Sequence, residues 1–136
     1  MSKQILIYTD GGARGNPGPA GAGAVVYSGE EVLAEVSEYL GEQTNNYAEY
    51  EAIILALQKC IDLGLNKNEV ELRADSKLAV EQLSGNWKVK NENVRKQFVK
   101  VQALLKEFAN IKFVHVPREQ NKVADALANK AMDSAQ

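Results

Sequence analysis

Two aspartates, Asp10 and Asp75, stand at positions where a carboxylate is costly unless something binds it. Asp10 follows the apolar run 3–9, and Asp75 follows the alternating segment 69–74. A carboxylate beside buried residues loses part of its hydration, and hydrogen bonds, a cation or a metal ion must offset that loss. Aspartate is also favoured in turns and at helix N-termini, so a purely local role is the alternative for both residues.

Two further acids, Glu49 and Asp125, lie in helical patterns. Helical steps of three or four residues connect Glu49 to apolar positions, namely Ala52, Ile53, Ala56 and Cys60. Glu49 therefore occupies a place where a core residue is expected, although an acid in the first turn also interacts favourably with the helix dipole. Asp125 lies beside the apolar stripe of the last segment, and its context alone is that of a surface acid.

Together the four acids define a candidate chemical site. In α/β sheets, ligands gather at the carboxyl ends of strands, where both aspartates are expected. Converging carboxylates repel one another, so they are an expensive feature with little structural use. An all-oxygen cluster selects hard cations such as magnesium or manganese. The matching chemistry is two-metal hydrolysis of a phosphodiester, in which one ion activates water and the other stabilises the leaving oxygen.

The patterns around these acids predict an α/β fold. Strands are expected at residues 3–9, 22–27, 32–40, 69–74 and 111–116, and the segment GGARGNPGPAGAG is expected to be a turn. Helices are expected from Asn45 or Asn46 to Gly64, at 76–83, at 91–109, and from Asn121 onward. This order indicates one domain, residues 1–136, with a mixed five-stranded sheet flanked by helices.

Net charge gives no general reason to expect a nucleic-acid partner. The formal charge is -2, so the chain has no overall basic field. The most basic stretch is 87–100, where one tryptophan is accompanied by Lys88, Lys90, Arg95, Lys96 and Lys100. This stretch is either a contact surface for nucleic acid or a solvated helix face.

The remaining composition argues against several other classes. The single cysteine, Cys60, lies in an apolar helical pattern, which predicts a small buried residue rather than a nucleophile. No long apolar run or secretory signal is indicated, so we expect no membrane contact and a cytoplasmic location. We also expect a monomer. The glycine-rich segments contain neither G-x-G-x-x-G nor G-K-[ST], which argues against dinucleotide and P-loop sites.

Four motifs surround the four acids in order, and their combination resembles the type 1 ribonuclease H (ribonuclease HI) family. The motifs are TDGGARGNPGPAG, TNNYAEYEA, RADSKLAV and PREQNKVADALAN. The resemblance implies the ribonuclease H fold and endonucleolytic hydrolysis of the RNA strand of RNA–DNA hybrids, leaving 5′-phosphate and 3′-hydroxyl ends. It further implies two Mg²⁺ or Mn²⁺ ions held by Asp10, Glu49, Asp75 and Asp125.

The same resemblance implies contacts to the nucleic acid from Gly11, Asn16, Thr44 and Asn45. Amides and hydroxyls are suited to this, because they hold phosphates and read 2′-hydroxyl groups. Turn and helix-cap roles are the alternatives for Asn16 and Asn45.

The chain departs from the family pattern in the loop before Asp125. Many members have a histidine there, whereas this loop is PREQNK and offers Arg118, which binds phosphate well but carries protons poorly. A surface salt bridge is the alternative role for Arg118. His115 lies earlier, in a strand pattern that places it with Phe113, and we expect it to be structural.

Two further departures concern substrate binding. Lys77 replaces a common glutamine, and SGNWKVKNENVRK is shorter and less basic than the insertion of longer members. We therefore expect weak, salt-sensitive substrate binding. Two alternatives stay open: a nuclease that also cleaves double-stranded RNA, which shares A-form geometry, and a non-catalytic nucleic-acid-binding module.

Overall fold

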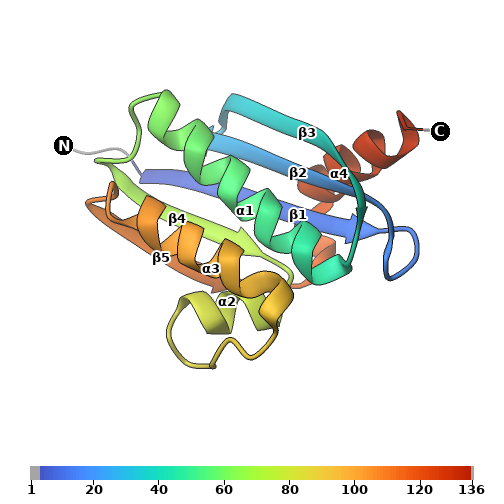
Figure 1. Ribbon diagram of the computed structural model, residues 1–136. Coiled ribbons are helices and arrows are strands. Elements are labelled where there is room, and N and C mark those ends of the chain that lie inside the picture. The colour runs from blue at the N-terminus through green and yellow to red at the C-terminus, as the bar shows by residue number, and fades with distance from the viewer. Residues whose placement is uncertain (1–3, 136) are drawn as a thin grey trace.

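The computed structural model describes residues 4–135, and its strands form a five-stranded sheet in the order β3-β2-β1-β4-β5 (Figure 1). The strands are β1 (Gln4–Ala13), β2 (Gly18–Ser28), β3 (Glu31–Gln43), β4 (Glu69–Ala74) and β5 (Asn110–His115). The helices are α1 (Asn45–Asp62), α2 (Lys77–Leu83), α3 (Glu92–Leu105) and α4 (Lys122–Asp133), with a 3-10 turn η1 (Arg118–Gln120). β1, β2 and β3 are antiparallel, whereas β4 and β5 run parallel to β1, which confirms the predicted mixed sheet.

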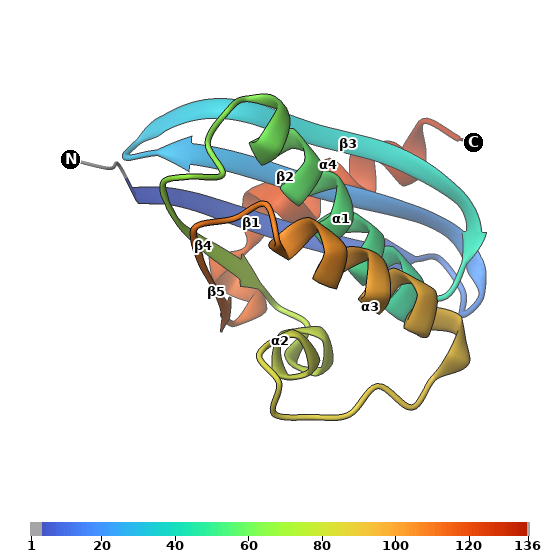
Figure 2. The ribbon, with the colours of Figure 1, turned by 60° about the vertical axis from the view of Figure 1, so that its left-hand side comes forward.

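Helices cover both faces of the sheet. α1 and α3 lie side by side on one face and α4 lies on the other, as the two ribbon views agree (Figures 1 and 2). The main core fills the space between the sheet and α1, where Ile7, Ile53, Leu57 and Leu72 are fully buried. Cys60 belongs to this core, as predicted, and burial raises the pKa of its thiol to about 11.

The glycine-rich segment after Asp10 is mostly strand, so the predicted long turn is wrong. β1 continues to Ala13 and β2 begins at Gly18, and the turn contains only residues 14–17. Asp10 consequently lies inside the β1–β2 pairing, opposite Gly23, and not at the end of a strand. The parallel pairing of β1 with β4 nevertheless stops at Thr9 and Ala74, one residue before each aspartate.

Close helix packing explains why these glycines are present. A Cβ at Gly11 would lie 2.1 Å from the Ala48 carbonyl oxygen of α1. On the opposite face, a Cβ at Gly23 would lie 2.3 Å from the Ala124 carbonyl oxygen of α4. Glycine is therefore required for the approach of two helix backbones to the sheet, a use that a local pattern does not distinguish from a turn.

The remaining elements agree with the predicted ones, with shifts at their ends. Thr44, and not an asparagine, caps α1, because its hydroxyl accepts from the Tyr47 N–H at 3.1 Å. α3 ends at Leu105, although Phe108 still packs against the core. None of the helices in residues 4–135 is long and apolar enough to cross a membrane.

Candidate active site

A pocket of about 430 Å³ lies where the parallel pairing of β1 with β4 ends. Its walls come from β1, the first turns of α1, the residue after β4, η1 and α4. All four candidate acids line it, together with Gly11, Gly12, Ala13, Arg14, Asn45, Arg118, Ala128, Asn129 and Met132. Segments far apart in the sequence thus bring Asp10, Glu49, Asp75 and Asp125 to one place, as predicted.

Asp75 is free for this pocket because another residue caps α2. The Ser76 hydroxyl accepts from the Ala79 N–H at 3.2 Å, so Ser76 and not Asp75 occupies the cap position. Asp75 follows the last residue of β4, next to Asp10 across the parallel pair of strands. The cap role that the sequence left open for Asp75 is therefore wrong.

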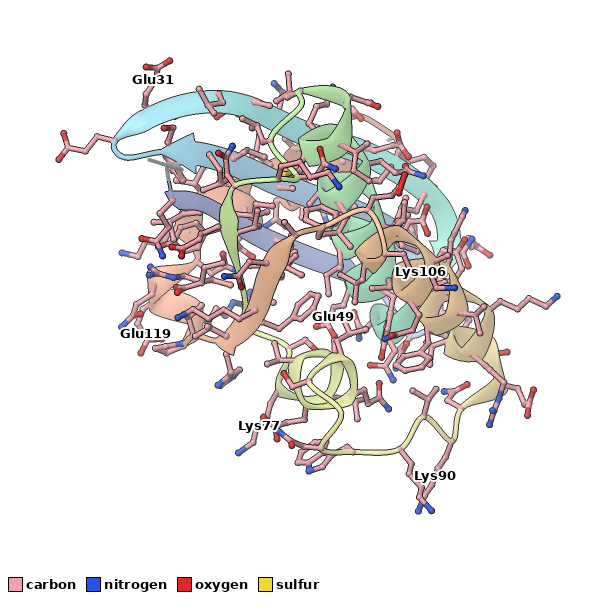
Figure 3. The ribbon with its side chains drawn as sticks, turned by 90° about the vertical axis from the view of Figure 1, so that its left-hand side faces the viewer. Glu31, Glu49, Lys77, Lys90, Lys106 and Glu119 are labelled. Carbon is pink, nitrogen blue, oxygen red and sulfur yellow. The ribbon has the colours of Figure 1, made fainter. Side chains whose placement is uncertain are left out.

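Glu49 reaches the pocket because α1 is pressed against β1 at Gly11. The flanking residues Ala48 and Tyr50 are buried, whereas Glu49 is half-buried and points into the space between α1 and α2 (Figure 3). Burial raises the pKa of the Glu49 carboxyl to about 7, with a smaller contribution from the charge of Asp75. A hydrogen bond from the Ser76 side chain acts in the opposite direction.

Asp10 lies at the centre of the electrostatic cluster. Burial, followed by the charge of Asp75 and a hydrogen bond and charge from Asp125, raises the pKa of Asp10 to about 9. Each effect disfavours a second or third negative charge in a small, poorly hydrated volume. The acids therefore hold a proton among themselves at neutral pH until a cation neutralises them.

Asp125 is positioned by the packing of α4 on β1 and β2. The buried Asn121 donates from Nδ2 to the Thr9 carbonyl at 2.8 Å, which attaches the start of α4 to β1 beside Asp10. Asp125 follows one helical turn later, and its N–H donates to the Asn121 carbonyl at 3.1 Å. Asn121 thus holds Asp125 near Asp10.

The donor set fits a hard divalent cation. Four carboxylates supply only oxygen ligands, the type that magnesium and manganese prefer. Within residues 4–135, however, no three His, Cys, Asp or Glu side chains form a ready group for holding an ion. The four carboxylates surround the pocket instead, with Asp10 in hydrogen-bonding contact with both Asp75 and Asp125.

Arg118 is the cation beside Asp125. Its Nη2 lies 3.6 Å from Asp125 Oδ1, and its side chain is 79% exposed. This loose pair leaves most of the guanidinium accessible from the pocket, which Arg118 lines. His115 is exposed at the end of β5 and is not among the residues that line this pocket.

The four residues predicted to contact nucleic acid do not all share the pocket. Gly11 and Asn45 line it, whereas Asn16 is exposed in the neighbouring turn and Thr44 lines an adjacent hollow of about 340 Å³. Asn45 Oδ1 accepts from the Ala13 N–H at 2.8 Å, and Asn16 Oδ1 accepts from the Asn45 N–H at 3.0 Å. The two asparagines therefore fix the β1–β2 turn to α1, and their amide N–H₂ groups take no part in these two bonds.

Three residues of the site were missed by sequence reasoning. Ser76 both caps α2 and contacts Glu49, and its position directly after Asp75 was the available signal. Asn129 lines the pocket one helical turn after Asp125, a spacing that suffices to predict it. Arg14 also lines the pocket, but it lies in the segment that was interpreted as an unpaired turn.

Comparison with known proteins agrees with this geometry. The family model "Reverse transcriptase-like" matches residues 8–131. The bifunctional protein Rv2228c of Mycobacterium tuberculosis is 48% identical over 97% of this chain, which spans 36% of that protein, little more than a third. Ribonuclease HI of Halobacterium salinarum is 45% identical, with 97% of this chain and 66% of that protein covered. The crystal structure of LC11-RNase H1 in complex with an RNA/DNA hybrid is 50% identical, with a TM-score of 0.92 over 96% of this chain and 98% of that one.

Proposed function

Because this chain belongs to the type 1 ribonuclease H family, we propose that it is an endonuclease that hydrolyses the RNA strand of RNA–DNA hybrids. The expected products carry 5′-phosphate and 3′-hydroxyl ends. The observation that carries this proposal is the meeting of four acids from four separate elements in one pocket, with the pKa of Asp10 raised to about 9. Such an arrangement destabilises the fold unless it serves a cation, and perturbed pKa values are typical of functional sites.

We infer that the pocket takes Mg²⁺ or Mn²⁺, two ions per site when substrate is bound. Asp10, Glu49, Asp75 and Asp125 would hold these ions, which supply an activated water and stabilise the leaving oxygen. The fold of the protein fixes the positions of the acids. The glycines keep the backbones of α1 and α4 close to the strands, and Ser76 orients Glu49.

Substrate contacts in this proposal come from the rim of the pocket. Gly11 lines the pocket, but α1 fills the place of its missing side chain, so its contact to the RNA strand would come from the backbone of β1. The amide N–H₂ groups of Asn16 and Asn45 are suited to donate to phosphate or ribose oxygens. Arg118, mostly exposed beside Asp125, is suited to hold a phosphate, whereas a guanidinium keeps its proton and is a poor carrier of protons.

Cleavage of labelled substrates tests the proposal. We expect wild-type protein to cut an RNA–DNA hybrid when Mg²⁺ or Mn²⁺ is present, and Asp10→Asn to lower the rate by at least about a hundredfold, since it removes a central ligand and a charge. Asp62→Asn is the matched control, because it makes the same change in an exposed residue at the far end of α1.

The same assay separates the competing functions. A labelled double-stranded RNA beside the hybrid measures whether the enzyme requires a DNA strand. Absence of cleavage with intact hybrid binding indicates a non-catalytic module and contradicts the enzyme proposal, as does cleavage that Asp10→Asn does not affect. The expected monomer is checked by the molar mass of the protein in solution with and without hybrid.

A further inference from the structure

Arg14 lies on the rim of the carboxylate pocket, in the turn between β1 and β2, and the roles proposed above do not use it. Its backbone is firmly placed. The Arg14 N–H donates to the Pro19 carbonyl at 2.8 Å, and a Cβ at Gly18 would lie 2.3 Å from the Arg14 carbonyl oxygen. The tight hairpin therefore fixes where the Arg14 side chain leaves the chain, close to the residues that follow Asp10.

Two residues of α4 hold the Arg14 side chain. Its Nη2 lies 2.6 Å from Asp133 Oδ1 and donates to Asn129 Oδ1 at 3.4 Å. Asn129 in turn donates from Nδ2 to the Asp125 carbonyl at 3.0 Å. Both contacts of the guanidinium use the same nitrogen, and Nε and Nη1 make no recorded hydrogen bond within residues 4–135. Because the side chain is 35% exposed, these donors are available to a ligand in the pocket.

Three residues of α4 form a row along one side of the helix, and an arginine contacts each end of this row. Asp125, Asn129 and Asp133 are four residues apart, so they lie on one side of the helix. Arg118 contacts the first of them and Arg14 contacts the other two. The row is about 12 Å long at 1.5 Å per residue. A nucleic-acid strand carries phosphates at regular intervals, and two cations flanking the acids match phosphates on either side of the one that reacts.

We propose that Arg14 binds a phosphate of the RNA strand beside the scissile phosphate, and that Asn129 and Asp133 position its guanidinium for this contact. The inference rests on the proposed function. A guanidinium binds phosphate with two parallel hydrogen bonds, which requires a defined orientation. An exposed ion pair contributes little stability by itself, and Asp133 is 67% exposed, so positioning explains the pair better than stability does.

The test compares steady-state hybrid cleavage with the salt dependence of hybrid binding measured in a chelator. The variants are Arg14→Ala, Arg14→Lys and Asp133→Asn, with Lys106→Ala as the control that removes one exposed positive charge at the opposite end of the sheet. For Arg14→Ala we expect KM to rise about tenfold with little change in kcat, and the slope of log Kd against log salt to fall by about one. Arg14→Lys should keep the wild-type slope, because the charge is kept.

Asp133→Asn distinguishes substrate binding from a structural tie. It removes the partner but keeps Arg14, so the slope should stay as in wild type while KM rises less than in Arg14→Ala. An equal rise in KM for Arg14→Ala and Asp133→Asn, with the wild-type slope in both, would overturn the inference, and so would an unchanged KM and slope for Arg14→Ala. Failure of wild-type protein to cleave the hybrid would contradict the proposed function instead, and the binding slope would still decide whether Arg14 contacts phosphate.

Discussion

The Asp10 carboxyl is costly to ionise in the folded protein. Burial and the neighbouring acids Asp75 and Asp125 raise its pKa to about 9, far above the 3.8 of an unperturbed aspartate. In the folded protein this carboxyl therefore keeps a proton over a pH range in which the unfolded chain has lost it. A metal ion favours the ionised form, so metal binding releases protons and becomes tighter as pH rises.

Replacing this carboxyl should stabilise the metal-free protein at neutral and alkaline pH. Between pH 4 and pH 9 the folded state binds more protons than the unfolded state at Asp10, so stability decreases as pH increases through this range. Asp10→Asn removes the effect. We expect the free energy of unfolding at pH 8 to increase by about 1 kcal/mol or more, which corresponds to a rise in Tm of a few degrees. Below pH 4 the gain should disappear, because the carboxyl is then protonated in both states.

Thermal unfolding in a chelator at pH 4 and pH 8 measures this effect. Asp62→Asn serves as the control, since Asp62 is exposed and is the last residue of α1, whereas Glu49 lies near the start of this helix. Equal or lower Tm for Asp10→Asn at pH 8, relative to wild type, would show that Asp10 carries no such cost. Addition of Mg²⁺ should raise the Tm of wild type more than that of Asp10→Asn.

At the scale of elements, glycines decide how closely α1 and α4 approach the sheet. At Gly23 a Cβ would lie 2.3 Å from the Ala124 carbonyl oxygen and 2.6 Å from the Ala128 N–H nitrogen. Both contacts are with helix backbone, so α4 itself must shift. Gly23→Ala should therefore destabilise the protein by about 2 kcal/mol, as overpacking does, and should reduce activity further by displacing Asp125.

Denaturant unfolding and cleavage rates of Gly23→Ala check both parts of this prediction. Gly12→Ala is the matched control for stability, because its nearest contact would be the Met132 methyl group at 4.0 Å. If Gly23→Ala unfolds at the wild-type denaturant concentration, the contact between β2 and α4 is not as tight as the distances indicate.

The same elements mark what could be predicted from the sequence. Alternation and helical spacing correctly located the strands and helices, because these patterns follow from which faces are buried. The segment after Asp10 was mistaken for a turn, since glycine in a turn and glycine under a packed helix leave the same local signal. The convergence of Asp125 on Asp10 depends on Asn121 and α4 packing across more than a hundred residues, which no local pattern contains.

At the scale of the whole molecule, positive and negative charges nearly balance. The net charge of -2 gives no long-range attraction for nucleic acid, so local groups must supply it. Lys77 and Lys90 project outward from α2 and from the loop that follows it, below the end of α1 that carries Glu49 (Figure 3). Trp87 in the same loop is 45% exposed, which is suited to contact with a nucleic-acid backbone.

This distribution predicts weak and strongly salt-dependent binding of the hybrid. With three or four phosphate contacts, affinity should fall by a factor on the order of 10² between about 50 and 200 mM salt. The double variant Lys88→Ala, Lys90→Ala should lower the slope of log Kd against log salt by nearly two if this loop contacts phosphates, whereas Lys106→Ala should not change it. Titrations of Asp10→Asn protein with labelled hybrid measure these slopes without cleavage. A high affinity that is flat across salt would contradict the prediction, and an unchanged slope for the double variant would show that Lys88 and Lys90 are solvated surface residues.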